Sequence, residues 1–114
     1  MKNDRFNLIL GRLVAFLRSE KLITQADFSK KLNLSTTSLS AKENGKDFSV
    51  SEFMMIVDVL NIDSVDNLIS DINRIHDALC VSFDQIGGWD GFIEKFKKPT
   101  LVKSINNSIY DYLR

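Results

Sequence analysis

The sequence is poor in cysteine, proline and glycine, and it has no net charge. It contains one Cys, one Pro and five Gly in 114 residues, and its 15 basic side chains balance 15 acidic ones. A single cysteine excludes an intrachain disulfide framework, and a reducing compartment fits. No apolar run approaches the roughly 20 residues that cross a membrane, and residues 1–10 show no signal-peptide pattern. We therefore expect a cytoplasmic protein with no membrane partner.

The charges are distributed unevenly along the chain. Residues 1–46 carry nine Lys and Arg against four Asp and Glu, residues 47–93 carry one against nine, and residues 94–114 carry five against two. Phosphate attraction is local, because salt screens it beyond about 8–10 Å. The basic first segment is therefore compatible with a polyanionic partner, and ordinary solvated charge explains it equally well.

Apolar residues recur at spacings of three and four along nearly the whole chain, which indicates an all-α protein. Polar caps divide the pattern into helices over about 5–21, 25–32, 36–44, 50–60 and 65–83. A short helix around Trp89, Ile93 and Phe96 and a last one from Pro99 follow. The predicted N-caps and helix ends are, in chain order, Thr24, Asn33, Ser35, Gly45, Ser49 and Ser64.

The fifth predicted helix carries a short heptad-like seam. Its apolar residues are spaced three, four, three and four apart: Val65, Leu68, Ile72, Ile75 and Leu79. The seam has two interpretations, because it can dock residues 63–114 on the rest of the chain or pair two copies into a homodimer. No linker or low-complexity segment interrupts this part, so we expect a structured helical extension.

Two short helices separated by a tight turn form a helix-turn-helix unit. In such a unit the first helix crosses the DNA backbone, and the second lies in the major groove with its N-terminal residues at base edges. The stretch from Gln25 to Glu43 has the required lengths, with small or apolar residues where the two helices must meet.

The stretch RSEKLITQADFSKKLNLSTTSLSAKENGK, from Arg18 to Lys46, resembles the lambdoid-phage repressor and Cro class of proteins, also called the Xre family. The most specific matches are Arg18 seven residues before Gln25 and the ending Glu43-Asn44-Gly45-Lys46. The resemblance covers about residues 8–62. It implies a DNA-binding domain over residues 1–62, while the extension over residues 63–114 resembles no family that we can name.

The resemblance implies a lambda-repressor-like bundle that binds double-stranded DNA. It implies an internal ion pair between Arg18 and Glu43. The side chains that it places at base edges are Thr36, Thr37, Ser40 and Ala41. The residues that we expect at phosphates are Gln25, Ser35, Lys42, Asn44 and Lys46. Lys42 departs from the family, in which an apolar or aromatic residue is usual, so it either changes the local packing or adds a phosphate contact.

The expected base-contacting residues include no Arg, Asn or Gln, the side chains that make bidentate contacts worth about 1–3 kcal/mol of discrimination. Hydroxyl groups bond to several bases, and the methyl groups of Thr and Ala contact thymine methyls. We therefore predict modest direct readout, supported by DNA shape and phosphate anchoring.

Other chemistry-bearing residues give no site. His76 and Cys80 lie four apart on one helix face, but zinc takes four ligands. Six aspartates lack the spacing of a calcium loop and fit a solvated acidic face: Asp58, Asp63, Asp66, Asp71, Asp77 and Asp84. We find no nucleophile and base in a catalytic pattern. The sequence thus predicts no metal, no cofactor and no enzymatic activity.

We expect a sequence-specific transcriptional regulator of prokaryotic or phage type, a repressor that acts as a homodimer on a palindromic operator. The dimer is expected because a single helix-turn-helix buries too little surface for tight specific binding. One alternative is an antitoxin-like or accessory protein whose helical extension binds a protein partner. Another is an interaction module that has lost DNA binding, which the weak base-reading face favours.

Overall fold

A computed structural model of the chain describes residues 4–84, 88–89 and 98–113. These residues form six helices and no strand: α1 Asp4–Glu20, α2 Gln25–Lys31, α3 Thr36–Glu43, α4 Val50–Val59, α5 Val65–Asp84 and α7 Lys98–Leu113. The all-α prediction is confirmed, and none of these helices is long and apolar enough to cross a membrane. Of the short helix predicted around Trp89, Ile93 and Phe96, the last two residues lie outside the described part of the chain.

The four predicted Ser and Thr caps lie at the starts of their helices. Each side-chain oxygen accepts a hydrogen bond from the backbone N–H three residues on, over 3.1 Å: Thr24, Ser35, Ser49 and Ser64. At α4 the Glu52 carboxylate accepts in return from the backbone N–H of Ser49 over 2.8 Å, which completes a capping box. Each cap stabilises its helix by about 1 kcal/mol, so these polar residues set where four helices begin.

Four successive helices end in the same way, with one residue in the left-handed region. These residues are Leu22, Asn33, Gly45 and Asn61, with φ of 58°, 58°, 116° and 54°. In each case the N–H of the next residue donates to a carbonyl five positions back, as from Ile23 to Arg18 over 3.1 Å. Asn33 and Gly45 confirm the predicted ends. Leu22 is the exception, because its Cβ strains this conformation and its 91% exposed side chain gains no packing.

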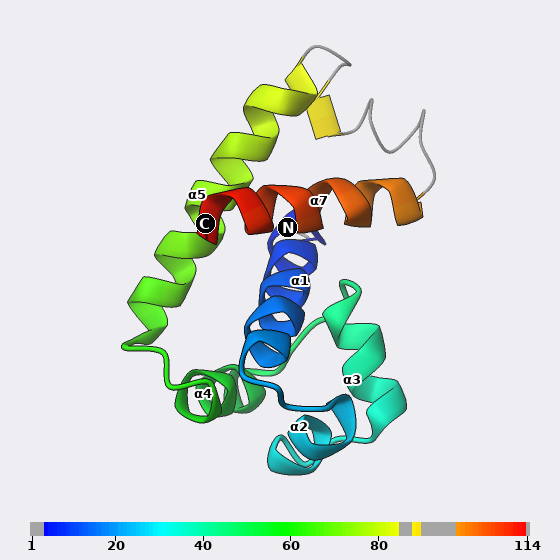
Figure 1. Cartoon of the computed structure of the whole chain (residues 1–114), viewed down its shortest axis with the longest axis vertical. Helices are drawn as coiled ribbons and strands as arrows, with labels where there is room; N and C mark the ends of the chain where they lie inside the picture. Colours follow the sequence, from blue (N-terminus) through cyan, green and yellow to red (C-terminus); the bar gives the residue numbers. More distant parts are fainter. Residues whose placement is uncertain (1–3, 85–87, 90–97, 114) are drawn as a thin grey trace.

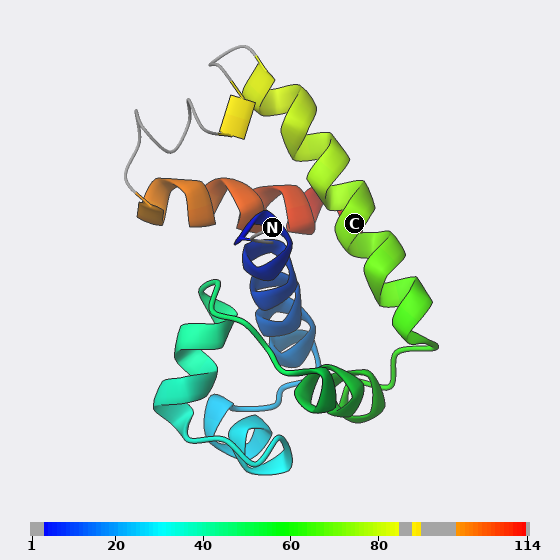
Figure 2. The same ribbon diagram turned by 180° about the vertical axis from the view of Figure 1, so that it is seen from behind.

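Helix α1 lies at the centre of the molecule, where it contacts α3, α5 and α7 (Figures 1 and 2). Its buried side chains lie on several sides of the helix: Leu8, Ile9, Leu10, Leu13, Val14 and Ala15. A helix that is apolar over so wide an arc needs partners on more than one side. Helix α3 packs on one side of α1, and α5 and α7 cover its other apolar sides.

The seam predicted in α5 faces the interior of the same chain. Val65 is partly buried, and the other four residues are at most 1% exposed: Leu68, Ile72, Ile75 and Leu79. They share one hydrophobic cluster with α1 and with the apolar stripe of α7, Leu101, Ile105 and Ile109. In this structure the seam is therefore docked within its own chain, the first of its two interpretations. The alternative, a homodimer formed through these side chains, is disfavoured because they are already buried.

The far end of α5 is closed by Trp89, which is 3% exposed. Its ring stacks on His76 at 5.5 Å between ring centroids, and its Nε1 donates to Cys80 Sγ over 3.1 Å. His76 and Cys80 are thus packing partners of a tryptophan. Among the described residues no group of three or more His, Cys, Asp or Glu side chains lies close enough to hold a metal ion.

Candidate nucleic-acid interface

Helices α2 and α3 pack on each other across a four-residue connection, residues 32–35. Phe28 and Ser29 of α2 and Leu39 of α3 are buried where the helices meet. The Ser29 hydroxyl donates to the Ala26 carbonyl over 2.9 Å, so this small polar side chain is satisfied in the contact. Since α3 buries only Leu39 and Glu43, most of its surface faces outward.

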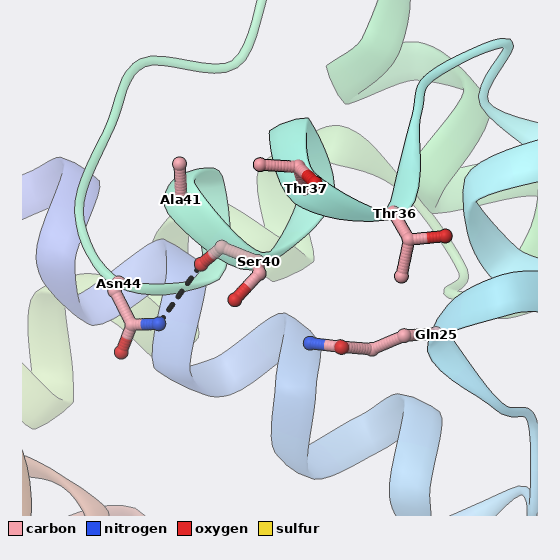
Figure 3. A pocket seen from close by; sticks show the side chains of 6 residues that line it. All are labelled: Gln25, Thr36, Thr37, Ser40, Ala41 and Asn44. Carbon is pink, nitrogen blue, oxygen red and sulfur yellow. Dashed lines mark hydrogen bonds between the residues drawn. The ribbon is translucent and has the colours of Figure 1, made fainter.

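The outward side of α3 carries the residues predicted at base edges. Thr36, Thr37 and Ala41 are exposed, and Ser40 is partly exposed. These four residues line a shallow open hollow together with Gln25 and Asn44 (Figure 3). The hollow therefore presents hydroxyls, methyls and two side-chain amides, with no charged group among its lining residues.

Glu43, the last residue of α3, is 2% exposed and joins three helices. Arg18 of α1 donates from Nε to Oε2 over 2.8 Å and from Nη2 to Oε1 over 3.1 Å. Gln25, the first residue of α2, donates to Oε1 over 2.7 Å. Arg18 also donates to the carbonyl of Ile23, over 2.9 Å, so its guanidinium holds the turn before α2 as well. The ion pair implied by the resemblance thus fixes the α2–α3 unit against α1.

Gln25 has a structural contact in addition to its place in the hollow. One of its amide N–H groups is used by Glu43, and the rest of the amide has no partner among the described residues. Figure 3 shows the amide directed toward the middle of α3 from the opposite wall of the hollow. Its orientation is therefore fixed, while its carbonyl oxygen and second N–H can meet a ligand.

Gly11 permits α1 to approach the C-terminal end of α3 closely. A Cβ at this position would lie 2.4 Å from the Lys42 carbonyl oxygen and 2.8 Å from that of Glu43, distances that real Cβ atoms do not show. This role of Gly11 was not predicted from the sequence. The sequence does show an isolated glycine inside a strong helical pattern, and such a glycine often marks a place where two helices pack closely.

Arg12 follows Gly11 and binds the end of α3 directly. Its Nη1 donates to Asn44 Oδ1 over 3.0 Å and to the Glu43 carbonyl over 3.3 Å. Burial lowers the pKa of the Arg12 guanidinium, the Glu43 carboxylate raises it, and nearby Arg18 lowers it further; the net pKa is lowered, and the group stays protonated at neutral pH. A cation at the carbonyl end of a helix is favourable. The role of Arg12 was not predicted, because nothing in the sequence around it distinguishes it from a solvated side chain.

Asn44 is held from both sides. Its Oδ1 accepts from Arg12, and its Nδ2 donates to the Ser40 carbonyl over 2.9 Å, the bond drawn in Figure 3. One amide N–H then remains without a partner among the described residues. The side chain is exposed at the end of the hollow, where it can donate to an anion.

Lys42, predicted at a phosphate, has partners within the chain. Its Nζ donates to Glu52 Oε1 over 2.6 Å and to the Asp47 carbonyl over 3.0 Å, and its side chain is 13% exposed. The ammonium also lies over the Phe48 ring, 5.7 Å from its centroid. The Lys42 ammonium is thus used in an internal ion pair, which disfavours the predicted phosphate contact.

The last two predicted phosphate contacts are exposed. Ser35 caps α3 with its hydroxyl and lies at the helix start. Lys46 follows the left-handed Gly45, and its ammonium has no partner among the described residues. Apart from Lys42, the residues expected to contact phosphates are Gln25, Ser35, Asn44 and Lys46.

Comparisons of the chain with models of protein families, with curated proteins and with solved structures give no match. Any function therefore has to follow from the residues of the chain itself. The relevant features are the outward hydroxyl-bearing side of α3, its attachment through Glu43, and the cationic and amide groups at its C-terminal end.

Proposed function

We propose that the chain is a transcriptional regulator that binds double-stranded DNA, with α3 in the major groove and α2 across the backbone. The observation that carries this proposal is the exposed side of α3. The helix buries only Leu39 and Glu43, and its other side presents Thr36, Thr37 and Ala41 to solvent. A helix that is held by one side and exposed along the other has the form that groove reading requires.

The dimensions of α3 support the proposal. Its eight residues span about 12 Å at 1.5 Å per residue, close to the width of the major groove of B-DNA, about 12 Å. So short a helix is unstable alone. Its caps and the buried ion pair of Glu43 with Arg18 keep it folded and oriented before DNA arrives. In this proposal α1 to α4 form a lambda-repressor-like helix-turn-helix bundle.

The proposed recognition depends on weak base contacts and firm anchoring. Thr and Ser hydroxyls accept and donate to several bases, and the methyls of Thr36, Thr37 and Ala41 fit thymine methyls. Gln25, Asn44 and their neighbours Ser35 and Lys46 would contact phosphates, which position the protein without reading sequence. Specificity is then shared with the shape of the DNA.

The proposal includes a homodimer on a palindromic operator. One α3 offers a small contact area, and two copies on half-sites a helical turn apart double it. Because the α5 seam is buried within the chain, the subunit contact lies elsewhere on the surface. Sedimentation equilibrium of the chain with and without a two-site duplex measures this stoichiometry, and one chain per two-site duplex at saturation would contradict it.

The test is DNA binding across a salt series, with random duplex and with the DNA upstream of the chain's own coding sequence. Binding through phosphates predicts that the logarithm of affinity falls linearly with the logarithm of salt concentration. Lys46→Ala and Asn44→Ala should weaken binding to all sequences alike. Arg74→Gln, a charge removed from α5 on the other side of α1 from α3, is the control and should leave affinity unchanged (Figure 1).

The base-reading role of α3 is tested at Thr37. Thr37→Val removes the hydroxyl and keeps a methyl, whereas Thr37→Ser keeps the hydroxyl and removes the methyl. If α3 lies in the groove, the two variants should change the order of preference among duplex sequences in different ways. Identical preferences in both variants and in the unmodified chain would contradict groove reading by α3.

A protein-binding role for the same surface is the second candidate. It is favoured by one observation, the absence of charged side chains among the residues that line the hollow. The salt series separates the two functions, because absent or salt-independent DNA binding supports the protein-binding role. In the antitoxin-like or accessory role, in which the helical extension binds a protein partner, the contact would use other residues of 63–114 than the α5 seam, since that seam is already covered.

A further inference from the structure

Arg12 connects the candidate DNA interface to the C-terminal helix. Its Nε donates to Oδ1 of Asn106 in α7 over 2.8 Å, while its Nη1 donates to Asn44 Oδ1 over 3.0 Å. One guanidinium thus spans α1, the end of α3 and α7. This contact places α7, which lies outside the segment that resembles a known family, beside an expected DNA anchor (Figure 1).

The guanidinium has unused donors. Arginine carries five N–H groups in a planar fork. Nε uses its proton on Asn106, and Nη1 uses both of its protons, on Asn44 and on the Glu43 carbonyl. The two N–H groups of Nη2 have no partner among the described residues. Arg12 is only partly buried and its guanidinium adjoins the exposed Asn44.

We propose that Arg12 is a phosphate-binding residue of the DNA interface and that Asn106 of α7 is the residue that positions it. This inference rests on the proposed DNA-binding function and assigns a role in it to the C-terminal helix. The two unused N–H groups of Nη2 can donate to phosphate oxygens, and Arg is favoured for such contacts over Lys because its planar guanidinium is preorganised. Asn44 and Arg12 would then hold the same stretch of backbone.

The neutral amide of Asn106 matters for this role. Its oxygen orients the guanidinium without cancelling the positive charge. A carboxylate at the same position would keep the hydrogen bond and neutralise Arg12 toward DNA. The substitution Asn106→Asp therefore separates the structural contact from the electrostatic one, because it preserves the first and removes the second.

The experiment measures DNA affinity of the full chain across about 50 to 200 mM salt for four variants, where each phosphate contact contributes about 0.9 to the slope. Arg12→Gln and Asn106→Asp should each lower the slope by about one and reduce affinity roughly tenfold at 0.1 M salt. Arg12→Lys should keep the slope and recover part of the affinity. Arg74→Gln, a charge lost from α5, should match the unmodified chain. Thermal unfolding of each variant is recorded in parallel.

A merely structural Arg12 gives a different pattern. Asn106→Asp would then retain both the unfolding temperature and the DNA affinity of the unmodified chain, and this result overturns the inference even if Arg12→Gln fails to fold. Salt-dependent binding by the unmodified chain with an unchanged slope in the variants overturns the inference alone. Absent or salt-independent binding by the unmodified chain overturns the proposed function, and the inference with it.

Discussion

The amide nitrogen of Gln25 lies 2.7 Å from Glu43 Oε1, which joins the first residue of α2 to the last residue of α3. The same carboxylate pairs with Arg18 of α1. Helices of seven and eight residues are too short to be stable alone, so their mutual angle depends on such tertiary contacts. One buried carboxylate therefore sets how α3 is presented to a ligand.

Glu43→Ala should destabilise the protein by about 3–5 kcal/mol, because it leaves the Arg18 charge and the Gln25 amide without a partner in a largely buried site. Urea unfolding followed by circular dichroism measures the change. The double substitution Arg18→Met with Glu43→Met is the control, and it should recover much of the loss because no buried charge remains. A cost for Glu43→Ala below about 1 kcal/mol, typical of an exposed pair, would contradict this account.

Gly11→Ala should destabilise the protein, by about 1–3 kcal/mol, since its Cβ would lie 2.4 Å from a backbone oxygen of α3 and one helix must move. Helix propensity alone predicts the opposite sign, a gain of about 1 kcal/mol for alanine over glycine. The sign of the change in unfolding free energy thus decides whether α1 and α3 are as close as described. A stabilised Gly11→Ala variant would show that they are not.

Leu22→Gly should stabilise the protein by about 0.5–1 kcal/mol. Relief of the left-handed conformation, about 1–2 kcal/mol, outweighs the extra chain entropy of glycine, about 0.5–1 kcal/mol. The exposed leucine side chain gives up no packing. Leu22→Ala is the matched control, because it removes the same bulk and keeps the Cβ, and it should give no gain. Equal stability of the two variants in thermal unfolding would refute the predicted strain.

The contribution of the Glu52 carboxylate to the stability of the fold should disappear in acid. Burial alone raises the pKa of its carboxyl, but hydrogen bonds from Lys42 and Ser49 outweigh burial and hold the pKa below its usual value. A group with a lowered pKa stabilises the fold fully above its unfolded pKa, about 4.3, and loses that effect as pH falls through the folded pKa.

This pH dependence is measured against Glu52→Gln, which keeps the shape of the side chain and does not titrate. The unmodified chain should be the more stable of the two from about pH 7 to 5, and the difference should shrink below about pH 4. A difference that stays constant down to about pH 3 would show that the ion pair with Lys42 contributes nothing.

Local signals predicted the limits of the helices well. Thr24 and Ser35 satisfy backbone donors within three residues, and Asn33 adopts the left-handed conformation within its own turn. These interactions depend on neighbours in sequence, so they are visible there. The limits of α2 and α3 agree with expectation to within one residue.

Contacts between distant segments were not predictable. Arg12 reaches the Glu43 carbonyl 31 positions away and Asn106 94 positions away, and no pattern of residues encodes either partner. Lys42 was taken for a DNA contact because its pairing with Glu52 depends on the path of the loop between α3 and α4. The apolar spacing of Leu68 and Ile72 predicts that they are buried, but not by which surface. The same spacing would serve for packing on α1 and α7 or on a second copy of the chain.

The bond from Arg12 to Asn106 has a consequence for synthesis of the protein. At about 5–20 residues per second, the ribosome adds the 94 residues between them in about 5–20 seconds. During that interval the apolar sides of α1 that α7 later covers have no native partner. These sides of α1 therefore stay exposed until α7 has been synthesised.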